Sequence, residues 1–316
     1  MRGQPARYAA GRLATCAVLL TALSLVVYVG VDLLPGDPAS ARLGPNATPD
    51  QVAVARDRLG LQEPLIRRYL EWAGGLLHGD LGTSAGGAPV SEALAGRLGN
   101  TAVLAVLTIA LLVPLSLVLG VALGRRGGSR ADGLGSTVLL LTTAVPEFVV
   151  AGTLALVLGA RLGWLPATSL IPAGDSPLSR PDVLVLPVVS LLWVSLAYAT
   201  RVIRAQTLTA LRAPHVEAMR LNGIPEGTVL RQGVLPAVLP SAVQIWLLSA
   251  AGLLGGTVLV EVVFNYPGIG TVLVSSVSTG DLPVVQALAM IMGAVTLLAT
   301  LAADVLGAAL GRTGTP

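Results

Sequence analysis

The sequence predicts an all-α polytopic membrane protein with six transmembrane helices. Of its 316 residues, 53% are hydrophobic and 12% are charged, whereas a soluble domain carries about 25% charged residues. The mean hydropathy is +0.78. A helix needs about 20 mainly apolar residues to cross roughly 30 Å of hydrocarbon. Six segments have about this length: residues 12–34, 101–123, 134–160, 183–200, 238–262 and 284–310.

The distribution of arginine predicts how these segments are oriented. All 20 basic residues are arginine, and loops rich in basic residues stay in the cytoplasm. Arginines gather before the first segment, between the second and third, and between the fourth and fifth. We therefore expect the chain to lie in the cytoplasmic (inner) membrane with both termini in the cytoplasm. Residues 1–11 form the cytoplasmic N-terminus. The first apolar run is longer than a secretory signal, so we expect it to remain as an uncleaved span.

Residues 35–100 form the long extracytoplasmic loop in this topology. Residues 50–60 predict a short helix closed by Gly60, and residues 64–72 place apolar side chains at helical spacing. A turn is expected at residues 79–82 because of its two glycines. The loop either covers the outer ends of the spans or serves as a gate or receptor dock.

The link between the fourth and fifth spans, residues 205–236, predicts a hairpin of two short helices. Pro214 suits the first position of a helix, and Gly223 suits the residue that closes it. Pro225 then starts a second helix. The positive end of that helix's dipole favours an acidic residue such as Glu226. Isolated helices this short have only marginal stability in water. The hairpin therefore needs a surface, either anionic lipid headgroups or a protein partner.

The pattern Glu217-Ala218-x-Arg220-x-x-Gly223 resembles the EAA loop of the membrane subunits of ABC importers. In that family the loop docks into a cleft of the ATP-hydrolysing subunit. The resemblance implies that docking involves His215, Glu217, Ala218, Arg220, Gly223, Pro225, Leu235 and Pro236. The chain departs from the family by carrying Asn222 where a lysine is common and His215 where an aromatic is common.

Further motifs resemble those of the dipeptide, oligopeptide and nickel permeases. They lie at residues 34–38, 59–65, 79–84, 163–167, 260–270 and 281–286. The resemblance implies the fold of a type I importer permease, with residues 101–316 as its core of five helices. It also implies three kinds of partner: a second homologous permease subunit, two ATP-binding subunits and an extracytoplasmic solute-binding protein. Peptides are the first expected cargo, and nickel or metal chelates are the next.

Catalysis by this chain is not expected. The phosphate-binding loop of ATPases requires a lysine, so ATP and Mg²⁺ belong to a partner. The two histidines, His78 and His215, are far apart, and no metal-binding or nucleophile motif is present. We therefore expect no catalytic, cofactor-binding or metal-binding residues. A net charge of +3 gives no reason to expect nucleic acid as a partner.

Three acidic residues lie within or at the end of predicted spans. Glu147, Glu261 and Asp304 are expected to contribute to the pathway or gate, because a carboxylate at the bilayer centre costs at least about 2.5 kcal/mol and therefore faces a cavity or a partner. Simpler structural roles remain open: Glu147 at a kinked helix, and Glu261 as an N-cap or arginine partner. Ion coupling through these acids would instead indicate a secondary transporter acting alone, and a membrane scaffold is a third alternative.

Overall fold

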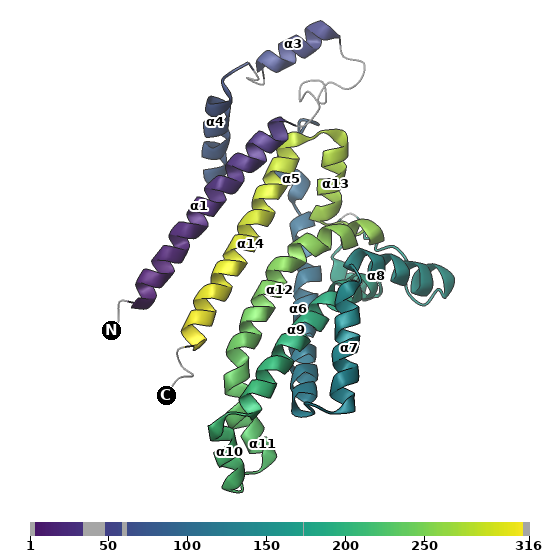
Figure 1. Ribbon diagram of the computed structural model, residues 1–316. Coiled ribbons are helices and arrows are strands. Elements are labelled where there is room, and N and C mark those ends of the chain that lie inside the picture. Colours follow the sequence, from purple (N-terminus) through teal and green to yellow (C-terminus); the bar gives the residue numbers. More distant parts are fainter. Residues whose placement is uncertain (1–3, 34–47, 59–61, 173, 312–316) are drawn as a thin grey trace.

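The computed structural model describes residues 4–33, 48–58, 62–172 and 174–311 (Figure 1). Within these ranges the regular structure is helical and contains no strand, so the prediction of an all-α polytopic membrane protein is confirmed. Five helices are long and apolar enough to cross a membrane. They are α1 (Gln4–Asp32), α6 (Arg97–Arg125), α9 (Val185–Leu211), α12 (Leu235–Phe264) and α14 (Leu282–Gly311).

The segment predicted as the third span, residues 134–160, is broken in the structure. Helix α7 (Arg130–Ala144) and the helix formed by α8 (Glu147–Leu154) with the π-helical η1 (Ala155–Arg161) meet at an angle of 91°. Val145 is extended, with φ −93° and ψ 119°, because the residue before a proline is forced out of the helical region by Pro146. The count is therefore five spans, or six if the bent pair is one span.

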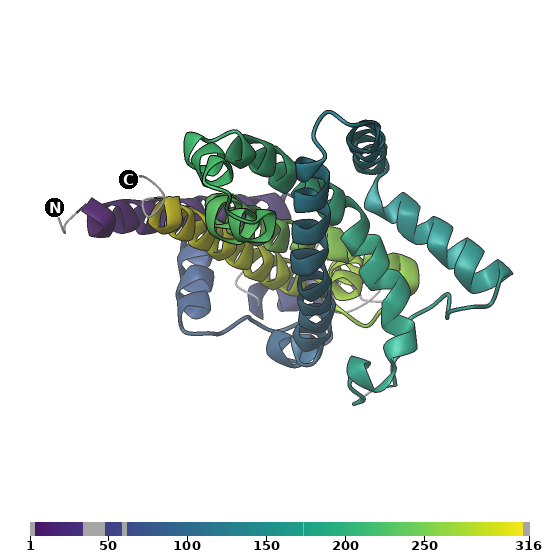
Figure 2. The same ribbon diagram turned by 90° about the horizontal axis from the view of Figure 1, so that it is seen from below.

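The spanning helices pack side by side in the order α1, α14, α12, α9 and α6 (Figure 1). The closest approach is between α6 and α9. A Cβ added at Gly120 would lie 2.6 Å from Ile203, and one added at Gly124 would lie 2.6 Å from Thr207. Glycine at these positions allows α9 to pack directly on the backbone of α6. Helices α7 and α8 both pack on α9, and α8 also contacts α12; Figure 2 shows the same helices from below.

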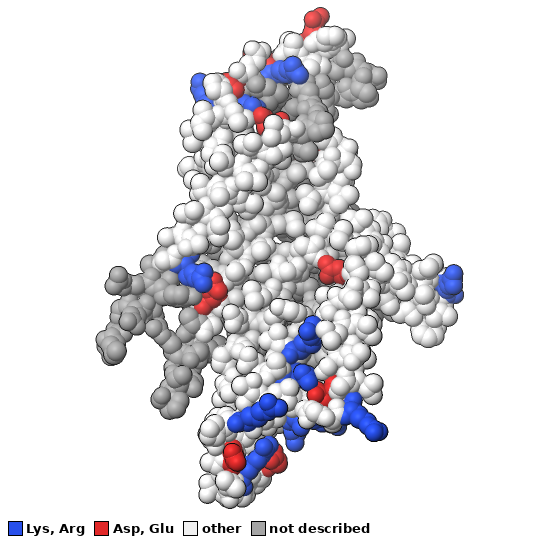
Figure 3. Space-filling view, in the orientation of Figure 1, with Lys and Arg blue, Asp and Glu red and all other residues white. Residues whose placement is uncertain are grey.

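The bundle has two different ends. The loop end carries α3 (Pro49–Arg58), α4 (Leu65–Leu77), α5 (Val90–Leu94) and α13 (Ile269–Thr279). The opposite, hairpin end carries α10 (Pro214–Leu221) and α11 (Glu226–Thr228). In Figure 3 charged side chains gather near the two ends of this face, and only a few separate charged groups lie at mid-height among uncharged residues. Gathering of charge at the two ends suits a bundle that crosses a membrane.

The predicted helices of the long loop correspond to α3 and α4, although Gly60 lies outside the described residues. Helix α4 packs on the end of α1 through a cluster of three rings, since Tyr28 has ring centroids 5.6 Å from Tyr69 and 5.2 Å from Trp72. Arg68 pairs with Asp32 at 3.1 Å. The long loop is therefore attached to the first span. The motifs at residues 34–38 and 59–61, and the tail from 312, also lie outside the described residues.

Candidate functional site

The first arm of the hairpin has the boundaries that its sequence predicts. Helix α10 begins with Pro214 and ends at Leu221. Gly223 follows with φ +72°, a left-handed conformation that side chains rarely adopt. Its N–H donates to the carbonyl of Arg220 at 2.9 Å, and the next N–H donates to Met219 at 3.1 Å. These bonds close the helix and turn the chain sharply.

The second arm differs from the prediction of a separate short helix. Helix α11 continues through a π-helical segment, η4 (Val229–Val234), directly into α12. No residue between Glu226 and Leu235 forces the helix to stop, so the chain stays helical. Pro236 has no N–H to donate to the preceding turn, and the widened π turn lies immediately before it. The hairpin is thus an extension of the fifth span.

The two arms of the hairpin pack against each other, which leaves one face of α10 exposed. Val216 is fully buried against Gly233, whose carbonyl lies 3.1 Å from the Nε2 of His215. Arg220 pairs with Glu226 at 2.8 Å across the turn. His215, Arg220 and Gly223 therefore shape the hairpin.

The opposite face of α10 is exposed along one stripe. Its members follow the spacing of a single helical face and are Pro214, Glu217, Ala218 and Leu221. Leu221 is 83% exposed, and the sequence analysis did not single it out. Pro225 is also exposed, whereas Leu235 and Pro236 lie at the base of α12.

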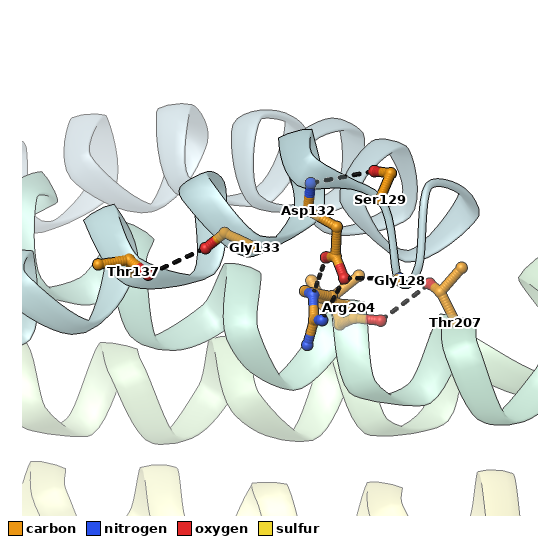
Figure 4. Close-up of polar contacts among 8 residues, drawn as sticks. Gly128, Ser129, Asp132, Gly133, Thr137, Arg204 and Thr207 are labelled. Carbon is orange, nitrogen blue, oxygen red and sulfur yellow. Dashed lines mark hydrogen bonds and ion pairs between the residues drawn. The ribbon is translucent and has the colours of Figure 1, made fainter.

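A partly buried ion pair joins the first turn of α7 to α9, near the hairpin. Asp132, 3% exposed, accepts hydrogen bonds from Arg204 Nε at 2.5 Å and Nη2 at 2.7 Å (Figure 4). The backbone N–H of Gly128 donates a third bond to the same carboxylate at 3.1 Å, and Ser129 caps α7. In the sequence, Arg204 served only as one of the arginines that predict the orientation of the spans. Its partner Asp132 is 72 residues away, so no local sequence pattern could reveal the pair.

Glu147 opens helix α8 directly after the Pro146 break. Its side chain lines a cavity of about 320 Å³ between α8, α9 and α12. The other lining residues are Val194, Ser195, Tyr198, Leu248, Ser249, Gly252 and Leu253. A Cβ at Gly256 would collide with the Glu147 carboxylate, so the acid lies against the backbone of α12.

Glu261 is fully buried and holds the start of α13. It accepts hydrogen bonds from the Thr101 hydroxyl and from the N–H of Gly270, both at 2.6 Å. Thr101 in turn accepts from the N–H of Ile269 at 3.0 Å. Glu261 and Thr101 thereby accept hydrogen bonds from two N–H groups at the start of α13 that have no partner within the helix. These contacts favour the N-capping alternative for Glu261, and Thr101 was not visible as its partner in the sequence.

Asp304 pairs with Arg12 Nη1 at 3.3 Å and so links α14 to α1. At the loop end, Asp281 accepts from the Ser84 hydroxyl at 2.6 Å and from the N–H of Ala85 at 3.0 Å. This contact brings together the motifs at residues 79–84 and 281–286. Within the part of the chain that the structure describes, no group of three or more His, Cys, Asp or Glu side chains could hold a metal ion.

A helical bundle with five candidate spans, or six if the bent pair is one span, defines the class of multi-pass membrane proteins. The chain belongs to a family within that class, the binding-protein-dependent transport system inner membrane components. The family's profile matches residues 116–313, and the profile of the family's N-terminal region matches residues 6–117. The chain is thus an ABC transporter permease subunit of the inner membrane, not itself catalytic and without a cofactor.

Relatives of known description cover nearly the whole chain. A putative peptide transport system permease protein of Brucella abortus (strain 2308) is 31% identical over 296 residues, which cover 93% of this chain and 94% of the relative. The oligopeptide transport system permease protein AppB of Bacillus subtilis (strain 168) is 30% identical, with 91% and 92% covered. A putative peptide permease protein of Brucella ovis is 32% identical, with 94% and 95% covered.

Proposed function

We propose that this permease carries peptides into the cell in an ATP-driven importer. It pairs with a second homologous permease subunit, two ATP-binding subunits drive it, and an extracytoplasmic solute-binding protein delivers the cargo. Peptide is proposed as the cargo because three relatives described as peptide or oligopeptide permeases align with more than nine tenths of this chain. In this topology the hairpin end faces the cytoplasm, which agrees with the arginines gathered there.

The ATP-binding subunit docks on the exposed face of α10. That stripe contains Glu217 and Ala218 of the EAA motif together with Leu221, which offers an apolar side chain to a partner. His215, Arg220, Gly223 and Pro225 hold the hairpin in shape for docking. An interfacial helix on anionic lipid is less well supported, because Arg220 is already paired with Glu226.

Movement of the hairpin reaches two spans directly. Two residues separate the end of α9 from the start of α10, and α11 continues into α12 without a break in helical structure. A push on the hairpin therefore tilts α9 and α12, which both line the Glu147 cavity. The ATP-binding subunits bias the transport cycle only if they bind its two states with different affinity.

Uptake by the reconstituted importer tests the cargo. Proteoliposomes containing both permeases, the ATP-binding subunits and the solute-binding protein are supplied with ATP and either labelled di- to pentapeptides or ⁶³Ni²⁺. The proposal expects ATP-dependent accumulation of peptide that an excess of unlabelled peptide suppresses. Accumulation of nickel or its chelates without accumulation of peptide would contradict it.

A further inference from the structure

The Glu147 cavity places one carboxylate and three hydroxyl groups among apolar residues, halfway along the spanning helices. Ser249 lies at the middle of α12 (Leu235–Phe264), and Tyr198 lies at the middle of α9 (Val185–Leu211). Both residues line the cavity with Glu147. Because a helix rises 1.5 Å per residue, the middle of a spanning helix lies near the bilayer centre. A carboxylate at this depth must face water, a ligand or another polar group.

The polar groups around the cavity lack partners inside the protein. Among the residues that the structure describes, no group donates a hydrogen bond to the Glu147 carboxylate, and no basic side chain pairs with it. The hydroxyls of Ser195, Tyr198 and Ser249 likewise have no partner there. By contrast, Ser190 of the same helix as Ser195 bonds back to the carbonyl of Leu186 at 2.8 Å. Helices α8, α9 and α12 thus each contribute to this cavity at least one polar group that has no hydrogen-bond partner within the described residues.

We propose that this cavity binds the α-ammonium group of the peptide during its passage, with Glu147 as the counter-charge. This inference rests on the proposed peptide import and adds a recognition site to it. An ammonium group has three N–H donors and no acceptor, which matches one carboxylate and the hydroxyl oxygens beside it. The volume of about 320 Å³ is at the lower end of the range for ligand pockets, so the site takes one end of a peptide.

The backbone around the cavity supports the same role for Glu147. The break at Pro146 ends α7 and places Glu147 on the first turn of α8, where the positive end of the helix dipole favours an acidic side chain. Gly256 lets the carboxylate lie against α12, because any side chain at that position would occupy its place. The acid is thus fixed in position beside an accessible cavity, and Tyr198, which is 52% exposed, also lines that cavity.

The direct test is peptide binding to the assembled importer in nanodiscs, without the solute-binding protein. Trialanine is the probe because its amino group is its only cation, and N-acetyl-trialanine is the matched ligand without that cation. Saturation-transfer NMR gives the Kd of each. We expect Glu147→Gln to weaken trialanine binding about tenfold or more, the effect of losing a charge-assisted hydrogen bond. Acetylation should weaken binding to the wild type by a similar factor, with little further loss in the variant.

Two controls keep the result decisive. Glu147→Asp retains the charge and should recover most of the affinity, and Glu92→Gln removes an exposed acid of α5 and should leave the Kd unchanged. Equal affinity of the wild type for both ligands, or no binding of trialanine, would overturn the proposal without any variant. Loss of the second permease from purified Glu147→Gln would also overturn it, because the acid would then serve subunit contact. Failure of the wild type to import any peptide would instead refute the proposed function.

Discussion

Arg204 of α9 holds Asp132 of α7 through two parallel hydrogen bonds, at 2.5 and 2.7 Å. Arg204 stands two turns before the end of α9, and α10 begins shortly after that end. The same stretch of α9 packs on the glycines of α6. The α6–α7 loop and the helix that leads into the hairpin are therefore joined as one body, which would move together when the hairpin is pushed.

Removal of either member of this pair alone should destabilise the protein. Asp132→Ala leaves the Arg204 guanidinium partly buried without a partner, which costs about 3 kcal/mol. The double variant Asp132→Ala, Arg204→Ala should lose less than the sum of the two single variants, because the residues are directly coupled. Thermal unfolding of the purified subunit in detergent measures both effects. Additive losses would show that the pair carries no coupling.

Changes to the hairpin should separate membrane insertion from coupling. Gly223→Pro cannot adopt the φ of +72° found there, and Glu217→Arg reverses the charge on the exposed face of α10. Both variants should reach the membrane normally, yet lose association with the ATP-binding subunit and reduce uptake at least about tenfold, the effect expected for a central interface residue. Co-purification measures association. Normal uptake in both variants would refute docking at this face.

Two neighbouring glycines of α12 offer a matched comparison. Gly256→Ala places a methyl group against the Glu147 carboxylate, whereas a Cβ at Gly255 meets nothing within 4 Å. We expect Gly256→Ala to reduce peptide uptake severalfold and Gly255→Ala to leave it near that of the wild type. Co-purification of the second permease is checked for both variants. Equal uptake by the two would show that the position of Glu147 does not matter for transport.

The cap on α13 should contribute to stability at the loop end. Glu261→Ala leaves the N–H of Gly270 and the hydroxyl of Thr101 without their acceptor, and a buried group left unsatisfied costs about 1–3 kcal/mol. Thr101→Val leaves the Glu261 carboxylate without this donor and the N–H of Ile269 without its acceptor, so it should also lower stability. Thermal unfolding gives the order of stability, and proteolysis near α13 reports local opening. Unchanged stability in both variants would contradict the capping role.

Length and apolar composition were sufficient to predict the five unbroken spanning helices. The ends of α10 followed from Pro214 and Gly223, because these residues have restricted or special backbone conformations. The 91° bend at Pro146 did not follow, since a proline in a span either continues, kinks or breaks the helix according to its tertiary neighbours. The continuity of α11 with α12 was not predicted, because residues 205–236 were expected to form a hairpin separate from the fifth span at residues 238–262.

The contacts between distant residues could not be predicted from one sequence. Asp132 and Arg204 are separated by 72 residues, and Thr101 and Glu261 by 160. The position of each acid indicated that it has a partner, because an acid near or inside an apolar segment needs one. The identity of that partner depends on how the helices pack, which the pattern of apolar residues does not specify.

The energy source of uptake tests the central claim most directly. Proteoliposomes are prepared with the complete importer, with the importer lacking its ATP-binding subunits, and with this permease alone. Each preparation is given labelled peptide with ATP or with an imposed proton gradient. The account predicts accumulation only by the complete importer and only with ATP. Accumulation driven by the proton gradient in vesicles that contain this permease alone would contradict it.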